Sequence, residues 1–149
     1  MGSRDGSALV PDGPAPAGVV AAFLGAGLEG VGQADVPGSD PAAVELTGVS
    51  HDSRTVAPGD LFCCVVGSEH DGHDFALSAV DSGAAALLVQ RTLDIGVPQL
   101  VVTDVRAAMA DAAAVVYGDP SSKLTVLGVT GTNGKTTVVS MLGAILADA

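Results

Sequence analysis

Residues 124–137 read LTVLGVTGTNGKTT, and this stretch decides the fold that we expect for the C-terminal part of the chain. The apolar run at 124–129 has the length of a buried strand, and an apolar helix is expected from about 136 to 146. A glycine-rich loop that contains Gly-Lys-Thr separates the two. A strand, such a loop and a helix together form a phosphate-binding loop, or P-loop.

Each part of this loop has a physical role in holding phosphate. Gly131 and Gly134 allow the backbone to turn sharply and to present its N–H groups inward, and the positive end of the following helix points to the same place. Lys135 supplies a catalytic cation for the β- and γ-phosphates, and the Thr136 hydroxyl is placed to ligate Mg²⁺. The predicted ATP phosphate-binding residues are Gly131, Thr132, Asn133, Gly134, Lys135, Thr136 and Thr137.

The loop departs from the strict P-loop pattern at one position. That pattern, G-x-x-x-x-G-K-[ST], requires glycine at 129, whereas this chain has Val129 with Gly128 one step earlier. A simple glycine turn between a strand and a helix is the alternative. The apolar run before the loop and the helix after it favour the P-loop.

Upstream, apolar segments of strand length alternate with segments of helical spacing. The expected strands cover 44–49, 61–66, 84–89 and 98–102. The expected helices cover 19–28, 73–82 and 106–117. This alternation predicts an α/β domain with a mixed or parallel sheet and flanking helices. We place a disordered tail at 1–17, the domain at 18–118 and the start of a central ATP-binding domain at 119–149.

Composition excludes several classes of protein. The net charge is −11 and the six Lys and Arg residues are scattered, so no basic patch suits a nucleic acid. No apolar run reaches the roughly 18 residues of a membrane span, and we find no targeting signal, so we expect a cytoplasmic protein. Cys63 and Cys64 are adjacent, so we expect buried thiols in place of a disulfide.

The segment GVTGTNGKTT at 128–137 resembles the loop of the Mur ligase family, whose members share the displaced glycine. Upstream, DSR at 52–54 and PGDLF at 58–62 resemble the family's N-terminal domain. The DPS segment at 119–121 is closer to members that add diaminopimelate or lysine to UDP-N-acetylmuramoyl-L-Ala-D-Glu. HDF at 73–75 is similar to members that add D-Ala-D-Ala, which remain the alternative. The resemblance covers residues 44–149.

This resemblance implies a fold and an activity. The fold would be a UDP-binding N-terminal domain plus the first strand, P-loop and helix of a truncated P-loop ATPase domain. The activity would be ATP-dependent amide-bond formation in peptidoglycan synthesis, through an acyl phosphate and with Mg²⁺. Because residues 119–149 cover only the start of the ATPase domain, we expect a truncated or excised piece without ligase activity of its own. The oligomeric state is left open.

The resemblance also implies a set of UDP-sugar contacts, which are His51, Ser53, Ser68, Glu69 and His70. Ser53 has a simpler interpretation as the cap of a turn. Histidine and aspartate at 70, 71, 73 and 74 would also suit a metal site, which we consider the weaker interpretation. Arg54 is expected to pair with a carboxylate such as Asp60 and not to contact ligand.

Two other functions remain open at this point. One is a stand-alone UDP-sugar-binding module with a vestigial P-loop. The other is a small P-loop regulator that completes its sheet by forming oligomers.

Overall fold

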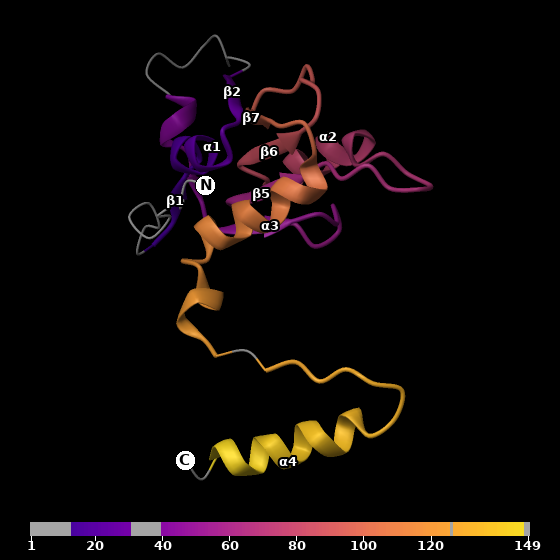
Figure 1. Cartoon of the computed structure of the whole chain (residues 1–149). Coiled ribbons are helices and arrows are strands. Elements are labelled where there is room, and N and C mark those ends of the chain that lie inside the picture. Colours follow the sequence, from indigo (N-terminus) through magenta and orange to yellow (C-terminus); the bar gives the residue numbers. More distant parts are fainter. Residues whose placement is uncertain (1–12, 31–39, 126, 148–149) are drawn as a thin grey trace.

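The computed structural model describes residues 13–30, 40–125 and 127–147. Within these residues a five-stranded sheet forms the centre of the domain (Figure 1). Its order is β2 (Gly27–Gly30), β7 (Pro98–Val101), β6 (Ala86–Val89), β5 (Asp60–Cys63) and β4 (Gly48–Ser50). β4, β5, β6 and β7 are mutually parallel, and β2 pairs antiparallel with β7 at one edge. The predicted mixed α/β sheet is therefore confirmed.

Alternate residues of the buried strands face two separate cores. Leu61 and Cys63 of β5 face the core formed with α1 (Ala17–Leu24) and α3 (Val105–Val116). Phe62 faces the opposite core, formed with α2 (Ala76–Asp81). Figure 1 shows the resulting three layers. Burial on both faces explains why β5 and β6 lack any alternation of polar residues.

The helices begin and end at recognisable signals. Gly25 ends α1 in the left-handed conformation (φ 62°), which glycine adopts without a Cβ clash. The Asp104 carboxylate caps α3 by accepting a hydrogen bond from the Ala107 N–H at 3.1 Å. The helix expected at 73–82 is a 3₁₀ turn, η3 (Gly72–Phe75), followed by α2.

A second, two-stranded sheet lies beside the main one and corrects two expectations. β1 (Ala15–Pro16) pairs antiparallel with β3 (Glu45–Leu46), just after the 3₁₀ turn η2 (Pro41–Ala43). The strand expected at 44–49 is thus divided between two sheets. The expected tail at 1–17 falls largely on residues 1–12, outside the described residues. Residues 15–17 belong to the folded domain, because Ala15 and Ala17 are buried.

The connection between β6 and β7 is a loop at 90–97 in place of a helix. Leu93, Ile95 and Val97 pack from this loop onto the same core as α2. Gln99 of β7, which is fully buried, holds the loop in place. Its side-chain amide accepts from the Leu93 N–H at 2.8 Å and donates to the Leu93 carbonyl at 2.7 Å. A parallel pair usually needs a longer crossover.

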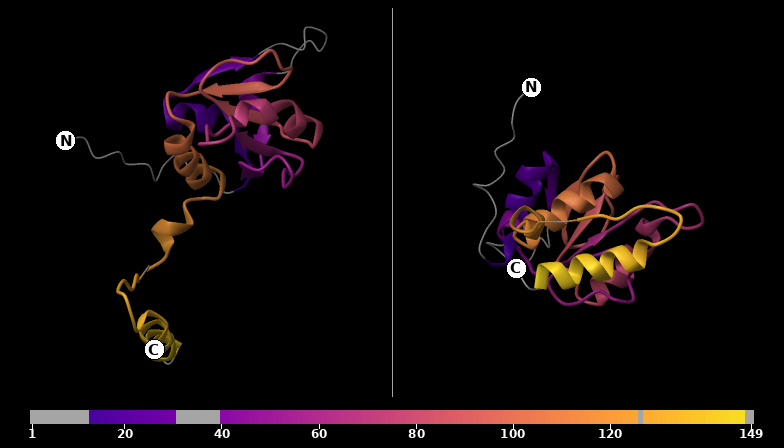
Figure 2. Two further views of the ribbon diagram at one scale, coloured as in Figure 1. Left: turned by 90° about the vertical axis from the view of Figure 1, so that its right-hand side faces the viewer. Right: turned by 60° about the horizontal axis from the view of Figure 1, so that its bottom comes forward.

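The C-terminal part follows a different course. After η4 (Pro120–Lys123) the chain runs without regular structure to α4 (Lys135–Ala147), which stands apart from the domain in Figure 1 and in the left view of Figure 2. The predicted helix is confirmed. The strand expected at 124–129 is not formed by residues 124, 125 and 127–129, since no neighbouring strand pairs with them. None of the helices in the described parts combines the length and apolar character that crossing a bilayer requires.

Candidate nucleotide-binding site

A cavity of about 490 Å³ opens where β4 and β5 end. Its volume lies within the range of small-molecule sites in proteins. The carboxyl ends of parallel strands are also the usual position of ligands in open α/β sheets. The lining residues are His51, Asp52, Ser53, Arg54, Phe62, His70 and Phe75.

The cavity brings together three of the five predicted UDP-sugar contacts. His51 and Ser53 come from the turn after β4, and His70 comes from the loop after β5, which lies 17 residues further along the chain from Ser53. Ser68 and Glu69 are exposed on that second loop and are not among the lining residues. The buried Phe62 and the exposed Phe75 also line the cavity, and the sequence interpretation included neither.

Hydrogen bonds fix the turn that carries His51 and Ser53. The Ser50 hydroxyl, nearly buried at the end of β4, donates to the Asp52 carbonyl at 3.1 Å and lies 3.2 Å from the Thr55 hydroxyl. The Thr55 N–H and hydroxyl both donate to that same carbonyl at 3.0 Å. The turn therefore presents its two predicted ligand contacts from a closed ring of hydrogen bonds.

Arg54 forms an ion pair at this cavity, and its partner corrects the expectation of Asp60. Its Nε and Nη2 donate to the two carboxylate oxygens of Asp52 at 2.9 and 2.6 Å. These hydrogen bonds hold the pKa of Asp52 well below its ordinary value and raise the pKa of Arg54. Asp60 is buried at the start of β5, paired with Gly48 at the other end of the strands, and accepts from the Ala57 N–H at 2.9 Å.

The loop after β5 is tightly closed at its base. The Gly72 N–H donates to the Val65 carbonyl at 3.0 Å, and Val66 and Asp71 form an antiparallel bridge. A Cβ at Gly72 would lie 2.6 Å from the Val65 nitrogen, so only glycine fits here. Near the tip, the Gly67 N–H donates to the His70 carbonyl at 2.9 Å.

His73 lies behind this loop and away from the cavity lining. Its side chain is fully buried, with Nδ1 2.6 Å from Asp71 Oδ1 and Nε2 accepting from the Gln90 N–H at 3.1 Å. Arg91 donates to the other Asp71 oxygen at 2.9 Å. Hydrogen bonds from His73 and Arg91 hold the pKa of Asp71 well below its ordinary value. Across the described residues, no group of three metal-ligating side chains comes together.

The predicted phosphate loop has local structure but no contact with this cavity. Residues 131–133 bend, Gly131 and Gly134 have positive φ (150° and 79°), and α4 begins at Lys135. The Lys135 ammonium group folds back onto the carbonyls of Gly131 and Thr132, the latter at 3.5 Å. Residues 130–137 are exposed. The loop thus bends directly before α4, and its lysine is held on carbonyl groups of the loop's own backbone.

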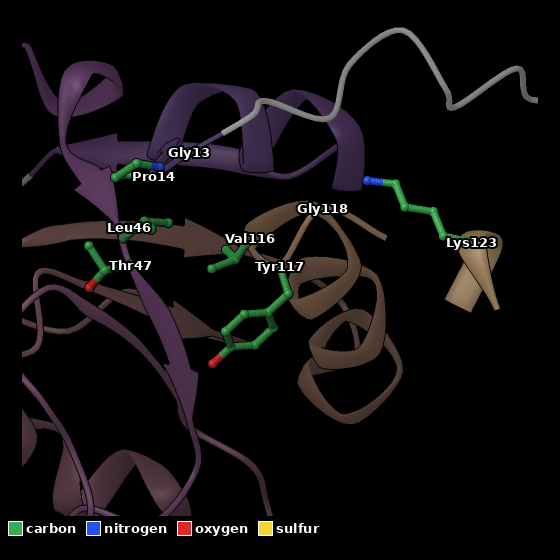
Figure 3. A pocket seen from close by; sticks show the side chains of 8 residues that line it. All are labelled: Gly13, Pro14, Leu46, Thr47, Val116, Tyr117, Gly118 and Lys123. Carbon is green, nitrogen blue, oxygen red and sulfur yellow. The ribbon is translucent and has the colours of Figure 1, made fainter. Parts of the chain in front are cut away.

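Two further cavities contain none of the predicted residues. One, of about 460 Å³, lies at the end of β7 beside the first turns of α3. The other, of about 410 Å³, lies where α3 ends and the C-terminal segment begins. Figure 3 shows Lys123 reaching back from η4 toward its other lining residues. Beside it, the Tyr117 hydroxyl accepts from the Val49 N–H at 3.0 Å and so joins the end of α3 to β4.

Comparison with known proteins decides the family. The sequence profile described as "Mur ligase family, catalytic domain" matches residues 45–133, which include both loops of the cavity and the first residues of the phosphate loop. The chain belongs to the Mur ligase family. The resemblance found in the sequence is confirmed.

One curated Mur ligase shows which members of the family this chain is similar to. The UDP-N-acetylmuramoyl-L-alanyl-D-glutamate–2,6-diaminopimelate ligase of Syntrophomonas wolfei is 48% identical over 111 residues. The match covers 73% of this chain and 23% of that ligase. The chain therefore spans about a quarter of the length of its curated relative.

Solved Mur ligases share the fold. MurF from Acinetobacter baumannii matches with a TM-score of 0.68 and 29% identity, over 93% of this chain and 29% of MurF. MurF from Thermotoga maritima, solved with ADP, matches with a TM-score of 0.50 and 33% identity, over 60% of this chain and 20% of that chain. Identity to these MurF chains is lower than to the diaminopimelate ligase.

Proposed function

We propose that this chain supplies the UDP-binding domain and the ATP phosphate loop of a ligase that adds diaminopimelate to UDP-N-acetylmuramoyl-L-Ala-D-Glu. One observation carries the proposal: two separate loops place His51, Ser53 and His70 around a single cavity at the ends of parallel strands. The higher identity to the diaminopimelate ligase than to MurF favours diaminopimelate addition over D-Ala-D-Ala addition. The product would serve peptidoglycan synthesis.

The cavity has the chemistry to hold a uridine diphosphate. A serine hydroxyl and imidazole N–H groups donate hydrogen bonds to uracil carbonyls or phosphate oxygens. Phe75, which is 41% exposed, offers apolar surface to the flat base. Ser68 and Glu69, on the exposed tip of the loop, would meet parts of the ligand that extend beyond the cavity.

The curved loop at 131–137 would hold the ATP phosphates. Lys135 and the loop amides would neutralise the β- and γ-phosphates, and Thr136 would ligate Mg²⁺ through its hydroxyl. The positive φ of Gly134, 79°, supports this role, because it allows the backbone to turn directly before α4. In the proposed reaction, ATP phosphorylates a substrate carboxylate, and the incoming amine then displaces the phosphate.

We also propose that the boundary between the UDP-binding domain and the ATP-binding domain lies between residues 118 and 119.

Calorimetry with UDP tests the first site. The chain should bind UDP, and Ser53→Ala should weaken binding about fivefold, since one hydrogen bond contributes about 1 kcal/mol. Ser78→Ala, on an exposed face of α2, serves as the matched control and should leave affinity unchanged. Equal affinities for all three proteins would remove Ser53 from the site, and no binding by the unmodified chain would refute the proposal.

A fused enzyme tests the second site. Residues 1–149 joined to the downstream part of the Syntrophomonas wolfei ligase should regain activity. In that fusion Lys135→Ala should lower kcat/KM by about 100-fold or more, because a charge that stabilises the transferring phosphoryl group is lost. Lys123→Ala, an exposed lysine in η4, is the control. Tight UDP binding by the 149-residue chain, with an inactive fusion, would favour a stand-alone UDP-sugar module.

A further inference from the structure

We propose that His73 is a positioning residue of the nucleotide-sugar site, which fastens the loop at 66–72 to the end of β6 and so holds His70 at the cavity. This inference rests on the proposed function. His73 itself is not among the lining residues, so it would act only through the loop.

The hydrogen bonds of His73 define its role and its tautomer. A backbone N–H only donates, so the Gln90 N–H requires a lone pair on His73 Nε2. The proton of the neutral ring then lies on Nδ1, where it is donated to Asp71 Oδ1 at 2.6 Å. With a fully buried side chain, the imidazole acts as a bridge between one loop and one strand end.

Asp71 is the loop side of this bridge. Its Oδ1 accepts from the His73 backbone N–H at 2.9 Å as well as from the ring, and its Oδ2 accepts from Arg91 at 2.9 Å. Arg91 directly follows Gln90 in sequence. Two consecutive residues beyond β6 therefore hold the same loop. Gln90 does so through the buried ring of His73, and Arg91 through Asp71 Oδ2.

The bridge lies close enough to the cavity to determine its shape. Asp71 is adjacent to His70, whose ring meets Phe75 edge to face with centroids 6.1 Å apart and an interplanar angle of 89°. Both rings line the cavity. On the opposite side of Asp71, Gly72 packs against the Val65 backbone with no space for a side chain. Without the hydrogen bonds of His73, the loop at 66–72 would be free to move, and His70 would no longer be held at the cavity.

Variants of His73 separate positioning from general stability. His73→Phe fills the space without either hydrogen bond, and His73→Gln keeps an acceptor within reach of the Gln90 N–H. We expect His73→Phe to weaken UDP binding about tenfold, and His73→Gln to recover most of that loss. Val115→Ala is the matched control, because it removes buried volume from the α1–α3 core, away from the loop.

UDP affinity is measured under conditions in which circular dichroism shows that each variant is folded. A lower affinity then cannot result from a fraction of unfolded protein. UDP affinity of His73→Phe within about twofold of the unmodified chain would overturn the proposal. So would an equal loss in Val115→Ala. If His73→Phe does not fold, Arg91→Met decides. This exposed substitution releases one Asp71 oxygen and should weaken UDP binding about threefold, and no change would overturn the proposal.

Amide hydrogen exchange provides a readout that needs no ligand. The N–H groups of Gly67 and Gly72 are hydrogen-bonded inside the loop and should exchange about tenfold faster in His73→Phe, but not in Val115→Ala. Unchanged exchange would refute the anchoring role. Faster exchange in a chain that never binds UDP would refute the proposed function and leave the anchor in place, so the two failures are distinguishable.

Discussion

The sheet-forming part of the chain, residues 13–30 and 40–118, and the described residues after it, 119–125 and 127–147, use similar apolar residues in opposite ways. In the domain, Leu61, Leu87 and Leu88 are fully buried between helices and sheet. In the segment, Ile145 and Leu146 of α4 are 64% and 58% exposed. The side chains named are similarly apolar, so the presence of packing partners makes the difference. Local signals suffice for the helix and the bend of the phosphate loop, whereas a sheet needs a neighbouring strand.

The two candidate sites differ in the same way. The cavity that we propose for UDP is held by contacts between distant residues, such as His73 with Gln90. The phosphate loop is held by contacts within four residues, such as Lys135 with Thr132. The first site should therefore depend on the stability of the whole domain, and the second only on its own short sequence.

The largest contrast is expected from two identical truncations. Leu88→Ala removes a fully buried side chain from the central strand β6 and should cost about 2–5 kcal/mol of unfolding free energy. Leu146→Ala in α4 should change it by less than about 0.5 kcal/mol. Urea unfolding followed by circular dichroism measures both. Equal losses would show that α4 packs against the domain in solution.

A smaller effect is expected at the start of α3. Asp104→Ala removes the carboxylate that accepts from the Ala107 N–H and should cost about 1 kcal/mol of unfolding free energy. Asp111→Ala, an exposed aspartate within the same helix, is the matched control and should change it by less than about 0.5 kcal/mol. A cap that contributed nothing would leave both variants with the same midpoint of urea unfolding.

The smallest effect concerns acid stability. In the folded chain, the pKa values of Asp71 and Asp52 lie below their ordinary value of 3.8. The unfolded chain therefore takes up protons first, and this stabilisation is present above about pH 4 and lost as the pH falls toward the folded pKa.

Asp71→Asn should therefore flatten the decline of Tm between about pH 5 and pH 2. Asp52→Asn should do so less, because its partner Arg54 has a side chain that is 86% exposed and screened by water. Thermal unfolding across this range measures both slopes. An Asp71→Asn slope as steep as that of the unmodified chain would remove Asp71 from the acid response.

Much of the fold could be predicted because its signals are local. The runs in β5, β6 and β7 and the Ala-rich α3 were located to within a few residues. The second sheet was missed because β1 and β3 lie about 30 residues apart and are each two residues long. The first residues of β2 fell within the helix expected at 19–28, because glycines are typical of the end of a helix. Only the pairing of β2 with β7 shows that this segment is a strand. The strand at 124–129 had the correct pattern but no partner.

The residues of the candidate site also differ in whether the sequence could predict them. The resemblance supplied His51, Ser53 and His70, and the fold places them around one cavity. The aromatic walls could not be predicted, because nothing in the sequence says which face Phe62 takes or how far Phe75 lies from His70. His73 was considered as part of a metal site. Its role as a bridge depends on Gln90, which lies 17 residues away.

The two buried cysteines can report local unfolding of the two cores. Cys63 belongs to the core beneath α1 and α3 and Cys64 to the core beneath α2, and burial raises the pKa of both thiols to about 12. A thiol reagent reaches neither while the domain is closed, since the reactive thiolate is absent there. Fragmentation of the labelled peptide in a mass spectrometer would therefore time the exposure of each thiol separately, with no engineered cysteine.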